Sequence, residues 1–313
     1  MTGQTPHHPG SESETVLVGV DAGGTKILGG LVRLDGTLIM EQRRPTRAAA
    51  LLADISDTAR AMIGEARALG LAPYGIGVGV KGFVERRSGR LVQSIVLDVA
   101  DLPIKERLAS EVHLPIAVDN DVHAATLGEL KFGIGRHFSD FVLYNAGTGL
   151  AVGMVFNHRL YRGANNYAGE SGHIGIDQSG VSICACGMSG CVEWLTLEAR
   201  KGRLHVPVRL PKMNQPAPSP EYAYVALNLI HIVNLLNPPA IALAGGMFTS
   251  NPAAADWVRE AVRRHVLPEA NEGLQSLPIA HAGAASGLVG AAALLLESDG
   301  VSSALHSATE ACP

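Results

Sequence analysis

The segment VLVGVDAGGTKILGGLVRLDGTLIM, residues 16–40, consists of three apolar runs separated by two polar turns. The first run, residues 16–20, is rich in β-branched residues and leads directly into Asp21-Ala-Gly-Gly-Thr-Lys26. The second run is followed by Asp35-Gly36, and Asp-Gly between apolar runs is a strong signal for a β-hairpin. The segment therefore predicts three antiparallel strands, the first of which ends in a loop of glycine and threonine.

The same order of features returns in residues 140–161, DFVLYNAGTGLAVGMVFNHRLY. A strand pattern again leads into a Gly-Thr turn, here Gly147-Thr-Gly149, and two further apolar runs follow on either side of Asn157-His158. Self-similarity within one chain indicates a repeated structural unit. We therefore expect a duplicated, two-lobed architecture in which each lobe opens with a polar loop.

The remaining periodicity alternates between strands and helices. Helical spacing extends from Arg47 to Leu69 and ends at Gly70, and a second helix over 221–236 is stopped by Asn237-Pro238-Pro239. Further strands are expected at 74–80, 115–118 and 240–244, and further helices at 123–131, about 256–265 and 286–296. Strands that alternate with helices predict a fold of the α/β class.

The length of 313 residues favours about two domains. The predicted organisation is a disordered tail (1–14), a small lobe (15–118), a large lobe (119–285) and a flexible tail (299–313). The C-terminal helix, about 286–298, is expected to pack back on the small lobe.

The composition excludes several classes of protein. Hydrophobic residues make up 47% and charged residues 17%, which excludes disorder of the whole chain. A net charge of −4 does not suit a polyanion binder, so no nucleic-acid partner is expected. No apolar run is long enough for a membrane span, and the first fourteen residues lack the features of a secretory signal. Three of the four cysteines are clustered in 184–191 rather than spread as in a disulfide framework, so we expect a cytoplasmic protein.

The two Gly-Thr loops have the composition of phosphate-binding loops. Backbone N–H groups can surround a phosphate where glycine allows close approach, and threonine and Lys26 would add a hydroxyl and a charge. Each loop alone could equally be a simple hairpin turn, but two in equivalent places favour a nucleotide-phosphate clamp between the lobes. The Gly77-Val-Gly79-Val-Lys-Gly82 string matches a dinucleotide fingerprint, yet no helix pattern follows it, so we dismiss it.

His173, Cys184, Cys186 and Cys191 form a candidate metal site. Three thiolates and one imidazole are the complement of tetrahedral zinc, and a fully protein-ligated zinc is structural. The alternative is a set of free buried cysteines, which packing alone rarely places so close together in the sequence.

Two groups of carboxylates are candidates for chemistry. Asp119-Asn120-Asp121 lies where a strand meets a helix, so Asp121 could accept a hydroxyl proton or merely cap the helix, and the local sequence favours the cap. Glu170 and Glu193 flank the cysteine cluster and could hydrogen-bond sugar hydroxyls, although exposed glutamates are usually only solvated.

Taken together, these motifs resemble the ROK family of sugar kinases and their repressor relatives, over about residues 16–296. The cysteine string is highly specific, whereas the Gly-Thr loops alone would not be. The strings that carry the resemblance are Asp21-x-Gly-Gly-Thr-Lys26, Asn120-Asp121-x-x-Ala-Ala-x-x-Gly128-Glu129, Gly147-Thr-Gly149, Gly169-Glu170-x-Gly-His173 and Cys184-x-Cys-Gly-x-x-Gly-Cys-x-Glu193. The resemblance implies the two-lobed actin-like ATPase (ribonuclease H-like) fold, with an active-site cleft between duplicated lobes.

The resemblance also implies roles for residues. Asp121 would be the general base, which overturns the preference for a cap, and ATP, Mg²⁺ and a structural Zn²⁺ would be the cofactors. The implied partners are a sugar or sugar-like acceptor and, as in many family members, a second copy of the chain. The implied acceptor contacts are Asn120, Glu170, His173, Glu193 and Gly82. The implied nucleotide contacts are Asp21, Gly23, Gly24, Thr25, Lys26, Gly147, Thr148, Gly149, Gly245 and Gly246, with Asp21 holding Mg²⁺ through water.

The implied activity is transfer of the ATP γ-phosphate to the primary hydroxyl of a hexose or amino hexose. Three departures from the family pattern stand out, of which the first two lie where the identity of the acceptor is set and the third is milder. Lys81-Gly82 stands where glucose kinases of the family commonly have Pro-Gly, Ser94–Asp98 replaces a segment with tryptophan, and Ala151-Val152 replaces glycines. Lys81 and Asp98 would suit an amino sugar or a cyclitol. A sugar-responsive regulator without a DNA-binding domain is the non-enzyme alternative.

Overall fold

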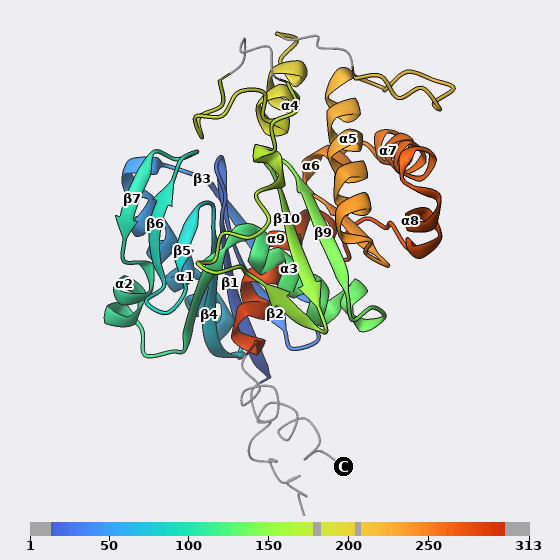
Figure 1. Cartoon of the computed structure of the whole chain (residues 1–313). Helices are drawn as coiled ribbons and strands as arrows, with labels where there is room; N and C mark the ends of the chain where they lie inside the picture. The colour runs from blue at the N-terminus through green and yellow to red at the C-terminus, as the bar shows by residue number, and fades with distance from the viewer. Residues whose placement is uncertain (1–13, 178–182, 204–207, 298–313) are drawn as a thin grey trace, which may run out of the picture.

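The computed structural model describes residues 14–177, 183–203 and 208–297, and two main sheets organise them (Figure 1). The first sheet has five strands in the order β3-β2-β1-β4-β8. β1 pairs antiparallel with β2 and parallel with β4, and β4 pairs parallel with β8. The bounds are β1 (Thr15–Ala22), β2 (Lys26–Arg33), β3 (Leu38–Pro45), β4 (Ala72–Val80) and β8 (Ile116–Asn120).

The second sheet repeats this arrangement with four strands in the order β11-β10-β9-β12. β9 pairs antiparallel with β10 and parallel with β12, as β1 does with β2 and β4. The bounds are β9 (Phe141–Ala146), β10 (Leu150–Phe156), β11 (Arg159–Tyr161) and β12 (Ile241–Ala244). The duplication expected from residues 16–40 and 140–161 is therefore confirmed, and the α/β class with it.

A small third sheet follows β4 directly. It has the order β5-β6-β7, with β5 (Phe83–Glu85), β6 (Arg90–Ser94) and β7 (Val99–Leu102). The Gly77–Gly82 string thus leads into a hairpin and not into a helix, so it is not a dinucleotide fingerprint.

Two helices, α3 (Asp121–Phe132) and α9 (Ser286–Ala293), lie at the centre of the molecule between the two main sheets (Figure 1). α9 lies on β1 and β4 so closely that a Cβ at Gly77 would lie 1.8 Å from the carbonyl oxygen of Ala291. A side chain at that position would push the C-terminal helix away from the first sheet. The opposite face of this sheet is covered by α1 (Leu51–Ala68), which the 3-10 turn Ala48–Ala50 precedes.

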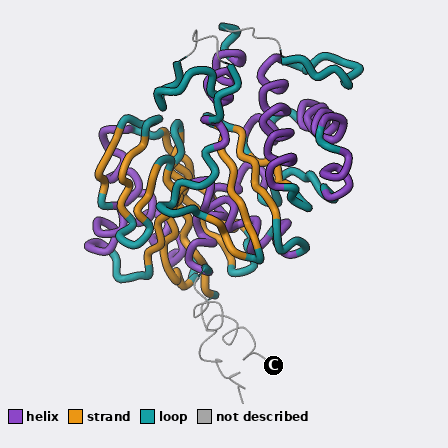
Figure 2. The backbone as a smooth tube through the Cα atoms, viewed as in Figure 1, coloured by secondary structure: helices purple, strands orange, loops and turns teal. Residues whose placement is uncertain are grey.

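Helices from the second half cover the outer face of the second sheet (Figure 2). Among the described residues, this sheet and these helices form the largest apolar core. α5 and α7 run side by side in this layer, and Tyr144 of β9 meets Phe248 edge to face. The helices are α4 (Val192–Arg200), α5 (Pro220–Leu236), α6 (Gly246–Thr249), α7 (Pro252–His265) and α8 (Pro268–Gly273).

The predicted elements are all present, with corrections at their ends. α7 begins four residues before the expected start because Asn251 caps it and Pro252 occupies its first turn. The last turn of the C-terminal helix is a 3-10 turn, Leu294–Leu296. The sequence analysis did not predict β7, α4, α6, α8 or α2 (Ile104–Glu111). The predicted tails lie almost wholly outside the described residues, and none of the helices within the described ranges has the length and apolarity needed to cross a bilayer.

Candidate active site

The two Gly-Thr loops face each other. The first loop closes after β1 with a hydrogen bond from the Gly23 N–H to the Lys26 carbonyl, 3.0 Å, and the second closes between β9 and β10 in a similar turn. A Cβ at Gly24 would lie only 3.7 Å from Oγ1 of Thr148. Both loops are therefore hairpin turns, as the simpler interpretation held, but the fold also brings the two turns together.

Asn120, and not Asp121, caps α3. Its Oδ1 accepts hydrogen bonds from the N–H groups of Val122 (2.8 Å) and His123 (3.2 Å), while its Nδ2 donates to the Gly82 carbonyl at 3.0 Å. Asp121 is the first residue of the helix, which starts two residues earlier than expected. Its Oδ1 is buried and has no hydrogen-bond partner among the described residues. The local preference for Asp121 as a cap is therefore wrong, because the neighbouring amide has that role.

Two cavities meet at Asp121. The first, which we call the carboxylate cavity, contains all six residues that the sequence analysis proposed for the base and the acceptor contacts. Its lining is Lys81, Gly82, Phe83, Ser94, Ile95, Val96, Asn120, Asp121, Val122, Leu150, Ala151, Glu170, His173 and Glu193.

The second, which we call the glycine cavity, has a volume of about 270 Å³ and opens beside the start of α9. Asp21, Lys26, Gly245 and Gly246 of the expected nucleotide contacts line it, whereas Gly23, Gly24, Thr25, Gly147, Thr148 and Gly149 do not. The rest of its lining is Asp121, Ala125, Asn145, Thr249, Ser250, Gly283, Ala284, Ser286 and Gly287. Asp121 is the residue that the two linings share.

Asp21 is a strongly perturbed carboxylate in the glycine cavity. Burial, together with the charge of Asp121, raises the pKa of Asp21 to about 7. The carboxylate also lies against α9, since a Cβ at Gly287 would be 2.4 Å from Oδ2. Two neighbouring carboxylates that repel each other fit a hard cation such as Mg²⁺, whose ligands are oxygen atoms.

The candidate metal ligands His173, Cys184, Cys186 and Cys191 converge. Their ligand atoms all lie within 4.8 Å of one another. Nδ1 of His173 is 3.7 Å from Sγ of Cys184, while Nε2 faces Glu170 at 3.8 Å from Oε2. The set fits one tetrahedral zinc ion at Nδ1 and leaves Nε2 turned toward the carboxylate cavity.

The carboxylates of the cavity are held differently. Oε2 of Glu193 accepts a hydrogen bond from the N–H of Leu150 at 2.7 Å, which ties α4 to the start of β10. Burial raises the pKa of Glu170. The charge of Asp121 raises the pKa of Lys81 although burial opposes it, so a cation stands among these acids.

A network of charges lies behind the Asn120-Asp121 pair. Nε of Arg162 donates to Oδ2 of Asp119 at 2.9 Å, and its two terminal nitrogens bind both carboxylate oxygens of Glu297. Burial opposes ionisation of Asp119, but hydrogen bonding by His123 and the charge of Arg162 hold its pKa well below the usual range. The network fixes the end of β8, and with it the backbone that carries Asp121. No local pattern in the sequence predicts this network, because its members are far apart in the chain.

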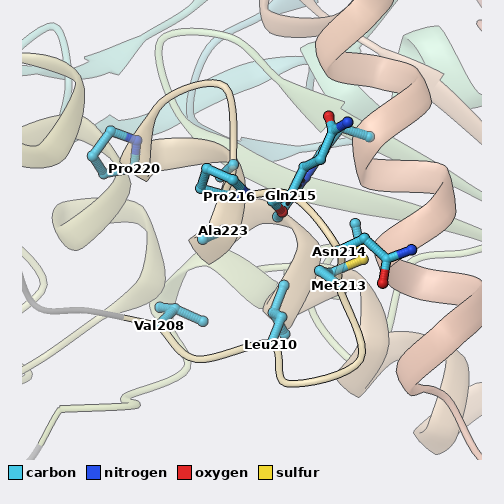
Figure 3. Close-up of a pocket in the computed structure, with 10 residues that line it drawn as sticks. Val208, Leu210, Met213, Asn214, Gln215, Pro216, Pro220 and Ala223 are labelled. Carbon is cyan, nitrogen blue, oxygen red and sulfur yellow. Dashed lines mark hydrogen bonds between the residues drawn. The ribbon is translucent and has the colours of Figure 1, made fainter.

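An apolar cavity of about 480 Å³ lies elsewhere, between the proline-rich segment 208–220 and helices α5 and α7 (Figure 3). Its lining includes Leu210, Met213 and Trp257, and the described residues of the lining include no acid, base or nucleophile. These described side chains offer no group for catalysis, so the candidate active site is the pair of cavities at Asp121.

Comparison with known proteins gives the same family as the motifs. The family model that matches is described as the ROK family, and it covers residues 17–199 and 217–298. The chain belongs to the ROK family. The glucokinase of Streptomyces coelicolor is 28% identical over 91% of this chain and 98% of its own length. The xylose repressor of Bacillus spizizenii is 26% identical over 83% of this chain and 72% of its own length.

A solved structure of a ROK family glucokinase from Streptomyces griseus, in complex with glucose and AMPPNP, superposes on this ROK chain with a TM-score of 0.74. It is 27% identical and is matched over 89% of this chain and 98% of its own. The resemblance to the ROK family and the two-lobed actin-like ATPase fold are thus confirmed.

Proposed function

We propose that this protein transfers the γ-phosphate of ATP to the primary 6-hydroxyl of a hexose or amino hexose, with Asp121 as the general base and Mg²⁺ as a cofactor. In its reaction class the protein is an ATP-dependent carbohydrate kinase of the glucokinase-like type. The observation that carries the finer proposal is the place of Asp121, because its unpaired carboxylate oxygen lies where the carboxylate cavity meets the glycine cavity.

The carboxylate cavity suits the acceptor. Glu170 and Glu193 supply hydrogen-bond acceptors for sugar hydroxyls, and the free N–H of the Asn120 amide and Nε2 of His173 supply donors. The backbone of Gly82 adds a further polar contact. His173, Cys184, Cys186 and Cys191 would hold a structural zinc ion, and ligation would keep the imidazole turned toward the acceptor.

The glycine cavity suits the nucleotide. The facing loops, Gly23-Gly24-Thr25 and Gly147-Thr148-Gly149, lie outside the lining of this cavity, and we propose that their backbone N–H groups and threonine hydroxyls contact the phosphates, while Lys26 of the lining adds a positive charge. Gly245 and Gly246 leave room for the adenosine at the start of α6. Asp21 would hold Mg²⁺, which would supply positive charge to the phosphate oxygens.

The reaction follows from this placement. The Asp121 carboxylate accepts the proton of the attacking hydroxyl, whose oxygen forms a bond to the γ-phosphorus. The bond from that phosphorus to the β,γ-bridging oxygen breaks, and its electron pair stays on ADP. The loop amides stabilise the charge that develops, and closure of the lobes excludes water as a competing acceptor.

The identity of the acceptor depends on the departures from the family pattern. Lys81 lines the carboxylate cavity together with Ser94, Ile95 and Val96, whereas Asp98 is exposed and does not line it. Of the two residues expected to suit an amino sugar or cyclitol, only Lys81 is therefore placed to contact the acceptor. A specialised amino sugar or cyclitol is the second candidate for the acceptor, and a regulator that binds sugar without phosphorylating it is the non-enzyme alternative.

The test is sugar-dependent formation of ADP by the purified protein. Glucose, mannose, glucosamine and a C7 cyclitol are each supplied with ATP and Mg²⁺, and product position is read by phosphorus and proton NMR. We expect phosphorylation at the primary hydroxyl of at least one hexose. Binding of sugar without ADP formation would instead support the regulator. We further propose a cytoplasmic homodimer, which light scattering after gel filtration checks in the same preparation.

A further inference from the structure

Lys81 is the one lysine or arginine among the described residues that line the carboxylate cavity, as Lys26 is in the glycine cavity. Its backbone is fixed on both sides. The Lys81 N–H donates to the Ala22 carbonyl at 3.0 Å, and the next carbonyl, of Gly82, accepts the Asn120 amide. A positive φ of 135° at Gly82 completes this bend. The backbone position of Lys81 is thus fixed by the end of β1 and by Asn120, the residue that caps α3.

The ammonium group extends from the first lobe to the second. Its Nζ would be 3.2 Å from a Cβ at Gly149, in the second Gly-Thr loop, and Oε2 of Glu193 is beside the same point. The charge that acts on it most strongly is that of Asp121, followed among the acids by Glu193, Glu170 and Asp21. Two of these acids, Glu170 and Glu193, line the acceptor side and Asp21 lines the nucleotide side, so the ammonium stands near the crossing point between the cavities.

The ammonium has unused hydrogen-bonding capacity. No carboxylate oxygen lies within 4.0 Å of it in the described parts of the chain, although four acids are near enough to act on its charge. A largely enclosed ammonium that donates no direct ion pair is costly, and the cost is offset when a ligand supplies oxygen atoms. A phosphoryl group that leaves ADP for the acceptor would meet Asp121, Glu170 and Glu193, all of which repel it.

We propose that Lys81 is a further catalytic residue, whose ammonium binds the non-bridging oxygens of the phosphoryl group on the acceptor side, in the transition state and in the phosphorylated product. This inference rests on the proposed kinase function. The step itself is unchanged, with the hydroxyl proton passing to Asp121 and the electron pair of the broken bond to ADP. The lysine neutralises charge where the loop amides do not reach, which is the usual role of a cation in phosphoryl transfer.

The experiment compares the unphosphorylated and phosphorylated sugar as ligands of Lys81→Met, which keeps the length of the side chain and removes its charge. Calorimetry measures the Kd of glucose and of glucose 6-phosphate, or of glucosamine and its 6-phosphate if glucosamine is the better acceptor. We expect Lys81→Met to bind the sugar within threefold of the wild type, to bind the phosphate at least ~10-fold more weakly, and to have a kcat lower by roughly 10- to 100-fold. Lys81→Arg, which keeps the charge, should recover part of both losses.

The controls separate the possible failures. Lys201→Met removes an exposed lysine whose partner is Glu198, and it should change neither Kd nor kcat. Unfolding temperatures show whether each variant is folded. Equal weakening of the sugar and its phosphate would overturn the proposal and make Lys81 a hydroxyl contact, as would unchanged binding and turnover. A wild-type protein that phosphorylates no acceptor contradicts the kinase function itself, which is a different result from a working kinase indifferent to Lys81→Met.

Discussion

The two Gly-Thr loops have related backbones and different charges. In the first lobe Asp21 is the penultimate residue of β1, while in the second lobe the neutral Asn145 is the penultimate residue of β9. The parallel neighbour differs in the same way, because β4 leads into Lys81-Gly82 and β12 leads into Gly245-Gly246. The duplication thus places a Gly-Thr turn in both lobes, whereas Asp21 and Lys81 of the first lobe have neutral counterparts in the second.

The largest effect is expected from a substitution at Asp121, where the two cavities meet. Asp121→Asn keeps the shape of the side chain but removes the base, so kcat should fall at least ~100-fold while the Kd of the acceptor stays within a few-fold. Calorimetry and a coupled ADP assay measure the two quantities. Asp98→Asn, at an exposed aspartate of the first lobe, is the matched control and should be silent. Turnover of Asp121→Asn close to wild type would reject Asp121 as the base.

In the second lobe, the turn after β12 consists of two adjacent glycines in different environments. Gly245 has a φ of 91°, and a Cβ there would lie 2.2 Å from the Ala146 carbonyl oxygen, whereas a Cβ at Gly246 would meet nothing within 4 Å. Gly245→Ala should therefore be strained and lower the unfolding temperature by about 5 °C or more. Gly246→Ala should leave that temperature within ~2 °C and raise the KM for ATP, because its methyl group enters the glycine cavity.

Calorimetric scans and ATP titrations of both variants distinguish strain from loss of space. If Gly246→Ala changed neither stability nor the KM for ATP, the nucleotide would not approach this turn, and the assignment of the glycine cavity would be wrong.

The sequence was most informative where chemistry and local pattern coincide. The Gly-Thr loops, Asn120-Asp121 and the cysteine cluster are short strings, so their residue types alone predict strands, turns and ligands. The cap was predicted wrongly because aspartate and asparagine compete for adjacent positions, and only the backbone shows which side chain reaches the free N–H groups.

Lys81 shows a different limit. The sequence identified it only as a departure from Pro-Gly, and its partner loop at Gly149 is far away in the chain. The salt-bridge network of Arg162 with Asp119 and Glu297 could not be predicted for the same reason, since tertiary packing brings three distant segments together. Asn145 and Gly287 of the glycine cavity carried no motif of their own, and the fold places them there.

The smallest expected effect is a change in stability at Asp21, whose counterpart in the second lobe is the neutral Asn145. In protein free of metal and nucleotide, the pKa of Asp21 is about 7 in the folded state against 3.8 in the unfolded chain. The folded state therefore holds the proton more tightly, so this residue lowers stability progressively as the pH rises from about 4 to 7, with the full penalty above that range. Asp21→Asn removes the penalty, so its unfolding temperature should exceed that of the wild type by a few degrees at pH 8 and by much less at pH 5.

The same variant should lose phosphoryl transfer, because an amide neither attracts Mg²⁺ nor replaces the carboxylate. Asp98→Asn, which removes an exposed carboxylate from the same lobe, should show no such pH-dependent gain. A constant difference between Asp21→Asn and the wild type from pH 5 to pH 8 would mean that Asp21 is ionised throughout. Asp21 would then destabilise the folded state no more than the neutral Asn145 does in the second lobe. The difference in charge between the two loops would affect ligand binding alone.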